Sequence, residues 1–135
     1  MFLRAFEPQT YAALRIVAGF LFLWHGSQKL LGFPPSSGGG EVPPFVLYVA
    51  GPIELIGGIL ILIGLFTSWT AFLCSGLMAG AYWLAHASFS NGFAGYLPLL
   101  NRGELAVLYC FVFLFIAARG SGIWSVDAMR SGSRR

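Results

Sequence analysis

The stretch from Val42 to Asn101 contains a single ionised side chain, that of Glu54. A soluble domain covers its surface with charge and on average carries about 25% charged residues. This chain carries 10% charged and 57% hydrophobic residues, so no water-facing surface can be built from the long uncharged stretch. We therefore expect an integral membrane protein, and the composition excludes an ordinary soluble domain.

Four apolar segments reach or approach the length of about 20 residues that crosses a hydrocarbon core of about 30 Å. They are residues 11–31, 45–66, 69–89 and 103–119. A Pro- and Gly-rich break separates the first two, a very short turn joins the middle two, and a loop over 90–101 leads to the last. We predict an all-α fold, a membrane-embedded four-helix bundle, in which residues 1–135 form one transmembrane domain.

The first segment is too long for the apolar core of a signal peptide, it carries Arg15 and His25, and no small-residue cleavage site follows it. We expect it to remain in the mature protein. Basic residues near membrane spans mark the cytoplasmic side. Because more of them accompany the termini than the loops, we predict an inner-membrane protein with both termini in the cytoplasm. The residues compared are Arg4, Arg130, Arg134 and Arg135 against Lys29 and Arg102.

The net charge of +3 comes largely from a basic tail formed by Arg130, Arg134 and Arg135. A tail of this kind beside a membrane span is expected to lie at the lipid bilayer and does not indicate a nucleic-acid partner. Small residues that allow helices to approach closely are the packing signal in lipid. Gly19 and Gly26 lie one heptad apart in the first segment, and Gly76 and Gly80 form a G-x-x-x-G pattern in the third. We expect these faces to pack tightly.

Ionisable side chains inside a membrane are costly and therefore are functional candidates. A rise of 1.5 Å per residue places His25, Glu54 and His86 roughly 9, 13 and 5 Å below the outer boundary, and Lys29 about 3 Å below it. Polar groups from all four helices are thus expected to gather in the outer half of the membrane. The candidates for ligand binding or proton handling are His25, Lys29, Glu54, His86, Asn101 and Glu104.

This cluster has two interpretations. Polar groups bonded between helices can simply fix the register of a bundle. Alternatively, two histidines and two carboxylates can line a pocket and exchange protons with a ligand. A metal site is not expected, because no H-x-x-x-H or E-x-x-H spacing occurs. Cys74 and Cys110 stand alone without a C-x-x-C motif, which is typical of small buried apolar residues rather than redox thiols.

Arg15 lies apart from this cluster, near the inner end of the first helix. Its expected counter-ion is Asp127, which follows the last helix at the cytoplasmic face. We predict an Arg15–Asp127 ion pair that folds the segment after the last helix against the bundle.

Several motifs occur in an order that resembles the DoxX family, and the resemblance extends over nearly the whole chain. They are Arg15-(x3)-Gly19, His25-Gly26-(x2)-Lys29-Leu30, Glu54-(x2)-Gly57-Gly58, Gly64-Leu65-Phe66-Thr67, His86, Asn101-(x2)-Glu104 and Gly120-(x)-Gly122-(x2)-Ser125-(x)-Asp127. Ser68 departs from the pattern, since many relatives have a basic residue there.

The resemblance implies a small four-helix inner-membrane protein. Members are linked with thiosulfate:quinone oxidoreductase subunits, with membrane complexes that handle oxidative stress, and with quinone or catechol detoxification. It implies no single reaction, and it points to His25, Lys29, Glu54, His86 and Glu104 as the positions to test first.

Two functions stay open at this stage. The first is a redox-associated membrane subunit that binds a quinone-like or other small apolar ligand in the outer half of the bundle. The sequence offers no electron carrier, so a redox step would need the ligand itself or a membrane or peripheral partner protein. The second is a non-enzymatic scaffold or assembly factor, acting on a partner's span or as a homo-oligomer, whose polar cluster is structural. A cavity bounded by His25, Glu54 and His86 favours the first, and side chains that fill that space favour the second.

Overall fold

The computed structural model describes residues 2–38 and 41–132, and this part of the chain is all-helical, as predicted. Four long helical segments carry the fold: α1 (Glu7–Leu31), η2 with α2 (Val46–Ala50 and Gly51–Ile63), α3 with η3 (Thr67–Ala81 and Tyr82–His86), and α5 (Glu104–Arg119). Shorter pieces are η1 (Arg4–Phe6), η4 (Phe89–Tyr96), α4 (Pro98–Asn101) and α6 (Val126–Gly132). The observed bounds lie close to the predicted ones, except that α1 begins four residues earlier than predicted, at Glu7.

Proline and glycine set several of these bounds. Pro8 lies in the first turn of α1, where a missing backbone N–H costs nothing. Pro52 lies where the π-helical η2 passes into α2. Gly32 and Gly64 end the same two helices with positive φ of 65° and 71°, the left-handed conformation that glycine adopts without strain. The stretch 90–101, predicted as a loop, instead contains η4 and α4, and the segment after α5 ends in α6.

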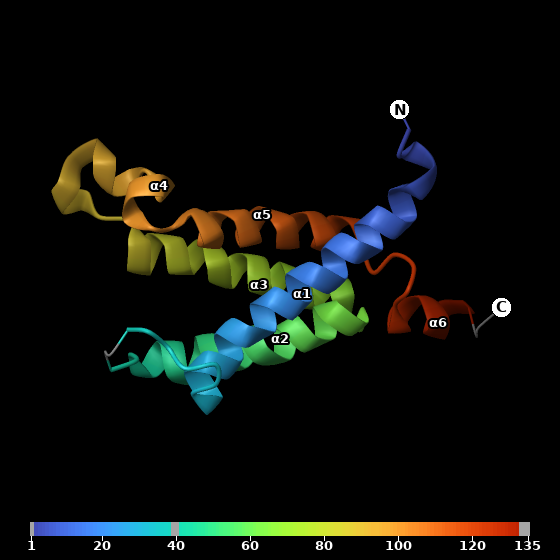
Figure 1. The fold of residues 1–135 in the computed structure, drawn as a ribbon, viewed down its shortest axis with the longest axis horizontal. Helices are drawn as coiled ribbons and strands as arrows, with labels where there is room; N and C mark the ends of the chain where they lie inside the picture. The colour runs from blue at the N-terminus through green and yellow to red at the C-terminus, as the bar shows by residue number, and fades with distance from the viewer. Residues whose placement is uncertain (1, 39–40, 133–135) are drawn as a thin grey trace.

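The four long segments form two hairpins. α1 lies along α2 and α3 lies along α5, while α1 and α5 meet only slightly (Figure 1). Both chain termini and the turn between α2 and α3 are at one end of the long axis, and the two longer connections are at the other (Figure 1). The buried core lies where the hairpins meet and includes Phe22, Ile61, Cys74 and Phe113.

Glycines determine how closely α1 and α2 approach. A Cβ atom added at Gly19 would stand 2.6 Å from the Leu62 nitrogen, and one at Gly58 would stand 2.6 Å from the Leu23 nitrogen. A Cβ atom added at Gly26 would likewise clash with backbone atoms of Leu55 and Gly51. The predicted close packing on α1 and α2 is therefore present.

The prediction for the third helix is wrong. A Cβ atom at Gly76 or Gly80 would have no neighbour within 4 Å among the described residues. This G-x-x-x-G face of α3 packs on no other element of the described chain, because α3 meets α5 and α2 through Ala71, Cys74, Ser75 and Met78 instead.

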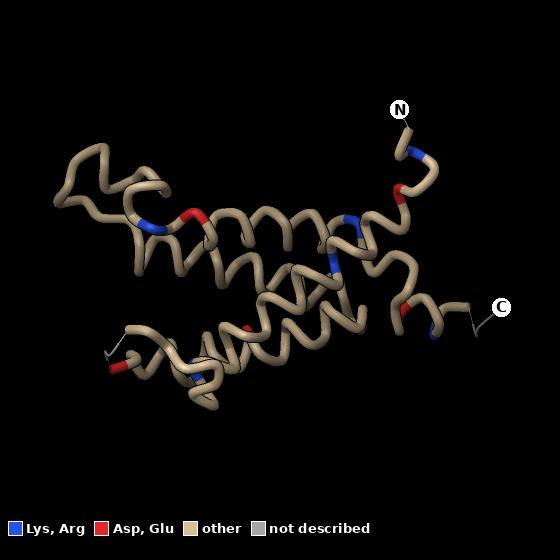
Figure 2. The backbone as a smooth tube through the Cα atoms, in the orientation of Figure 1, with Lys and Arg blue, Asp and Glu red and all other residues tan. Residues whose placement is uncertain are grey.

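One helical segment in the described part of the chain, Val46–Ile63, is long and apolar enough to cross a membrane by length and composition, with a mean hydropathy of 2.2. The charged residues gather towards the two ends of the molecule, and the helices between them carry few (Figure 2).

Candidate functional site

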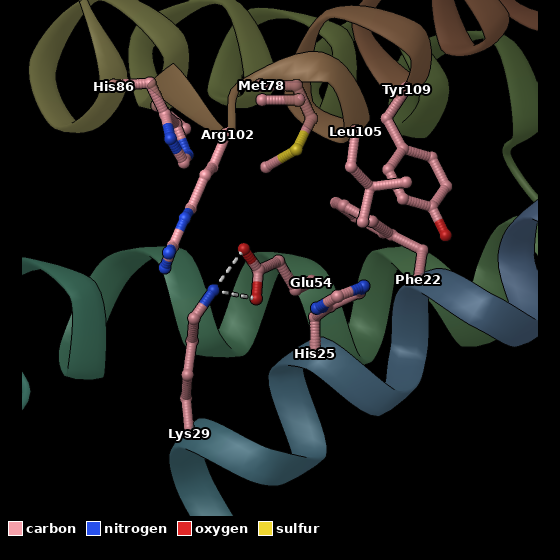
Figure 3. A pocket seen from close by; sticks show the side chains of 11 residues that line it. Phe22, His25, Lys29, Glu54, Met78, His86, Arg102, Leu105 and Tyr109 are labelled. Carbon is pink, nitrogen blue, oxygen red and sulfur yellow. Dashed lines mark hydrogen bonds and ion pairs between the residues drawn. The ribbon is translucent and has the colours of Figure 1, made fainter. Parts of the chain in front are cut away.

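A cavity of about 260 Å³ opens between the two hairpins, and all four long helical segments contribute to its wall. Four of the six residues predicted for ligand binding or proton handling line it: His25, Lys29, Glu54 and His86. Figure 3 shows His25 and Lys29 rising from α1, Glu54 from α2 between them, and His86 pointing in from the opposite hairpin. The remaining wall consists of Phe22, Met78, Ala81, Arg102, Leu105, Ala106 and Tyr109.

Lys29 and Glu54 form an ion pair across the α1–α2 hairpin. The Lys29 Nζ atom lies 2.6 Å from Oε1 and 2.5 Å from Oε2 of Glu54. The Glu54 side chain is only 3% exposed, whereas that of Lys29 is 26% exposed. Removal of one partner of a buried ion pair leaves the other charge uncompensated, so Lys29 is the counter-ion of the Glu54 carboxylate in the cavity.

The rest of the wall is aromatic and apolar on one side. Tyr109 stacks on Phe113 with ring centroids 5.3 Å apart, and Phe22 lies 4.7 Å from the same ring. His25 meets the edge of Tyr109 at 6.1 Å, and none of the described residues forms a hydrogen bond with its ring nitrogens. A planar apolar ligand would therefore contact the rings of Phe22 and Tyr109 while its polar atoms face His25, Lys29 and His86.

Arg102 is a cavity residue that the sequence-based interpretation placed only at the membrane boundary. It follows α4 with a positive φ of 61°, and its side chain extends towards the Lys29–Glu54 pair (Figure 3). With Lys29, Arg102 and Glu54, the cavity carries two formal positive charges and one negative charge. Tyr109 was also missed, because the sequence does not show that the face of α5 bearing Leu105 and Tyr109 is the one that lines the cavity.

Asn101 and Glu104 do not line this cavity. The Asn101 side chain donates to the Gly95 carbonyl at 3.0 Å and to the Tyr82 hydroxyl at 3.3 Å, and it accepts from the Gly103 N–H at 2.9 Å. Its backbone carbonyl lies 3.1 Å from Nδ1 of His86. Glu104 lines a separate groove with Leu108 and Phe111, since it stands two residues from Ala106 and hence on the other side of α5.

The predicted Arg15–Asp127 ion pair is wrong, because the two side chains have different partners. Arg15 is fully buried and donates to four carbonyls, those of Ile61 at 2.7 Å, Leu62 at 2.8 Å, Ile123 at 3.3 Å and Trp124 at 2.7 Å. It thereby satisfies the C-terminal carbonyls of α2, where a cation is favoured by the helix dipole. It also holds the segment before α6, so the predicted docking of that segment occurs through backbone oxygens.

Asp127 binds the N-terminal backbone of α3, on the other side of the turn between α2 and α3. Its carboxylate accepts hydrogen bonds from the N–H groups of Phe66 and Thr67 and from the Thr67 hydroxyl, each at 3.0 Å. Partial burial opposes the charge of Asp127, but these three bonds and the nearby Arg130 hold the pKa of the carboxyl below its ordinary value. Asp127 is thus an N-cap for α3 supplied from a distant part of the chain.

Neither cysteine lines the cavity. Cys74 is buried in the core, and Cys110 is partly buried beside Ser75, whose hydroxyl donates to the Cys110 carbonyl at 2.7 Å. Both are free. Within the ranges that the structure describes, no three His, Cys, Asp or Glu side chains lie close enough together to hold a metal ion.

Comparison with known proteins agrees with the motif order. The sequence profile of the DoxX family matches residues 10–87. An uncharacterized protein of Haemophilus influenzae is 41% identical over 127 residues, covering 93% of this chain and 93% of that protein. A protein of Bacillus subtilis named "Putative oxidoreductase CatD" is 28% identical, covering 92% of this chain and 88% of its own length. No solved structure matches. From the motifs, the profile match and the 41% identity over nearly the full length, the chain belongs to the DoxX family.

Proposed function

We propose that this protein is a redox-associated membrane protein whose cavity binds a quinone-like or other small apolar ligand. The observation that carries the proposal is the cavity bounded by His25, Glu54 and His86. An open space between these residues supports a ligand site, whereas side chains that filled it would support a structural cluster. Membership in the membrane-associated DoxX family and the similarity to CatD support the redox association.

In this proposal residues 1–135 form one membrane-embedded four-helix bundle of the inner membrane, with spans over α1, η2–α2, α3–η3 and α5. Large apolar side chains stand outward on these segments, for example Trp69 and Leu84, each 81% exposed, and Phe111, 64% exposed. Soluble monomers rarely expose so much contiguous apolar surface. Lipid contact accounts for it on every segment, although Val46–Ile63 alone among the described segments meets the criterion of length and hydropathy.

The orientation that we propose places both termini in the cytoplasm. The two termini share one end of the molecule (Figure 1), and more basic residues accompany the termini than the two longer connections. Basic residues near membrane spans mark the cytoplasmic side. The cavity then faces the outer leaflet, near the connections at the opposite end.

Each polar group has a role in this proposal. Lys29 and Arg102 donate hydrogen bonds to a carbonyl or anionic oxygen, and Glu54 holds Lys29 in place through the ion pair. The imidazoles of His25 and His86 exchange protons with the ligand. Electrons come from the bound ligand or from a partner protein of the membrane or its surface, because the sequence contains no cysteine cluster or dinucleotide-binding motif.

Purification in mild detergent, followed by mass spectrometry of extracted small molecules, tests this proposal. The wild type should carry a quinone-like compound, and Glu54→Gln should carry about tenfold less, because Lys29 loses the charge that positions it. Glu104→Gln is the matched control, since Glu104 is an exposed carboxylate outside the cavity, and it should retain wild-type content. Equal ligand content in all three proteins would remove Glu54 from the site, and no extracted ligand in any of them would refute the proposal.

One observation favours the scaffold alternative. The Gly76–Gly80 face of α3 is open, and small-xxx-small faces are common contact surfaces between membrane helices. If the protein acts as a scaffold, Gly76→Leu with Gly80→Leu should abolish its association with a second copy or with another span, as measured by cross-linking in membranes. The same variant should leave ligand content unchanged if the ligand-binding proposal holds.

A further inference from the structure

The two ring nitrogens of His86 lie in different surroundings. Nδ1 is 3.1 Å from the backbone carbonyl oxygen of Asn101, whereas no described residue forms a hydrogen bond with Nε2. A carbonyl oxygen has no proton to donate, so Nδ1 must carry the hydrogen of this bond. In the neutral ring Nε2 is then unprotonated, and it is a hydrogen-bond acceptor at the edge of the cavity.

The carbonyl that sets this tautomer is itself held firmly. Both ends of the Asn101 side-chain amide are engaged, with Gly95 and Tyr82 as acceptors and Gly103 as the donor. Tyr82 in turn donates to the Tyr96 carbonyl at 2.5 Å. His86 and Tyr82 are the two ends of the π-helical turn η3, so this network joins η3 to the connection that precedes α5. The side chain of Asn101 thus fixes its own backbone carbonyl against the His86 ring.

The other polar groups of the cavity differ from His86 in what they offer a ligand. Lys29 and Arg102 can only donate, whereas each carboxylate oxygen of Glu54 already accepts from Lys29 and retains a second lone-pair site. His25 has no hydrogen-bond partner among the described residues that would fix its tautomer. The wall therefore presents two groups that can only donate, Lys29 and Arg102, and one imidazole acceptor, His86 Nε2, whose tautomer is set by a backbone hydrogen bond.

We propose that Asn101 is a positioning residue that locks His86 in the Nδ1–H tautomer, and that His86 Nε2 accepts a hydrogen bond from a hydroxyl group of the ligand. The ligand class is a ring compound that bears at least one free O–H, such as a phenol or quinol, rather than a ring with ether or carbonyl oxygens alone. This inference rests on the proposed function for its ligand half. The part of the inference that concerns the His86 tautomer applies to the protein without ligand and does not depend on the proposed function.

Nitrogen NMR of the detergent-solubilised full chain, labelled with ¹⁵N-histidine, tests the tautomer half. The chain has two histidines, so a His25→Gln variant assigns both sets of signals. At about pH 8.5, where free imidazole is neutral, the His86 Nδ1 should show the chemical shift of a protonated ring nitrogen and Nε2 that of an unprotonated one. The reverse pattern, or averaged shifts like those of free histidine, would overturn the proposal.

Asn101→Ala should move the His86 signals towards those of free histidine, because the carbonyl loses the side-chain bonds that hold it. Asn91→Ala is the matched control, since Asn91 is an exposed residue of η4 in the same connection, and it should leave the His86 signals unchanged. Unchanged signals in Asn101→Ala would remove the positioning role. If Asn101→Ala does not fold, the wild-type spectrum still decides the tautomer.

The ligand half is tested with hydroquinone and its dimethyl ether, which share a ring and differ in the O–H groups. Hydroquinone should bind roughly threefold to tenfold more tightly than the ether, the range expected for one net hydrogen bond, and should shift the His86 Nε2 signal. Equal binding of the two compounds would overturn the hydroxyl requirement while leaving a ligand site in place. Binding of neither, with no ligand extracted from wild type, would instead refute the proposed function.

Discussion

Replacing Gly26 by alanine should separate α1 from α2 and destabilise the protein. The added Cβ atom would lie 2.7 Å from the Gly51 carbonyl oxygen and from the Leu55 Cα, and still closer to the Leu55 nitrogen. All three are backbone atoms, so no side chain can rotate away. Reaching an ordinary contact of 3.4 Å requires the helices to move apart by more than roughly 0.7 Å, because the Leu55 nitrogen is the nearest atom. A gap of that size forfeits about half of the dispersion energy of the contacts involved.

The expected magnitude follows from a comparison with Gly76→Ala. Both substitutions lie in helix interiors and gain the same helix propensity, up to about 1 kcal/mol for alanine over glycine. A Cβ atom at Gly76 meets nothing within 4 Å in the described chain, so Gly76→Ala keeps that gain. Gly26→Ala adds the overpacking cost of about 1–3 kcal/mol. The difference in unfolding free energy between the two variants should therefore be about 1–3 kcal/mol, with Gly26→Ala the less stable.

Reversible unfolding in mild detergent, followed by tryptophan fluorescence, measures this difference directly. Gly26 also lies one turn before Lys29 on α1, so Gly26→Ala should weaken the Lys29–Glu54 ion pair and lower ligand content as well. Equal stability of the two alanine variants would show that the α1–α2 hairpin is not held by the close approach at Gly26, and the account of the fold would be wrong.

Two further predictions concern the turn between α2 and α3. Arg15→Ala should cost about 3 kcal/mol or more of unfolding free energy, because it removes four hydrogen bonds to backbone carbonyls. Arg15→Lys should recover only part of that cost, since an ammonium cannot reach all four carbonyls. Equal stability of wild type and Arg15→Ala would contradict this. Asp127→Asn should cost about 1 kcal/mol at neutral pH, because an amide nitrogen cannot accept the two hydrogen bonds that Thr67 donates to the second carboxylate oxygen. Since the pKa of Asp127 is lowered below its ordinary value of 3.8, the contribution of its charge is complete at neutral pH and is lost as the pH falls below about 4. Denaturation measured between pH 7 and 3 should therefore show wild type and Asp127→Asn converging at the acid end, and a constant difference refutes the role of the charge.

The long helices and the convergence of His25, Lys29, Glu54 and His86 could be predicted from the sequence. Apolar length gives the helices, and helical rise gives the common depth of their polar residues. The direct Lys29–Glu54 contact could not be derived, because it depends on how closely α1 and α2 approach. Sequence identifies the glycines that permit this approach, but it does not say which partner they meet, as the open face at Gly76 demonstrates.

The partners of Arg15 and Asn101 were missed for a different reason. Charge alone suggests Asp127 as the partner of Arg15, because both are expected at the cytoplasmic face and carry opposite charges. In the folded protein Arg15 and Asp127 bind backbone atoms at helix ends, and Asn101 binds backbone atoms in a connection and the Tyr82 hydroxyl. Backbone donors and acceptors are the same at every residue type, so which of them is free depends on where each helix ends.

The position of the cavity follows from what holds the two ends of the molecule. At the end with the termini, Arg15 and Asp127 tie the C-terminus of α2, the N-terminus of α3 and the segment before α6 into one unit. At the other end each longer connection closes a single hairpin, α1 to α2 or α3 to α5. There the structure leaves the space that His25, Glu54 and His86 line (Figure 3). Because the two hairpins are clamped together at the first end, the angle between them sets the width of the cavity at the second. Arg15 and Asp127 should therefore influence ligand binding without touching the ligand, through the same bonds by which they stabilise the fold.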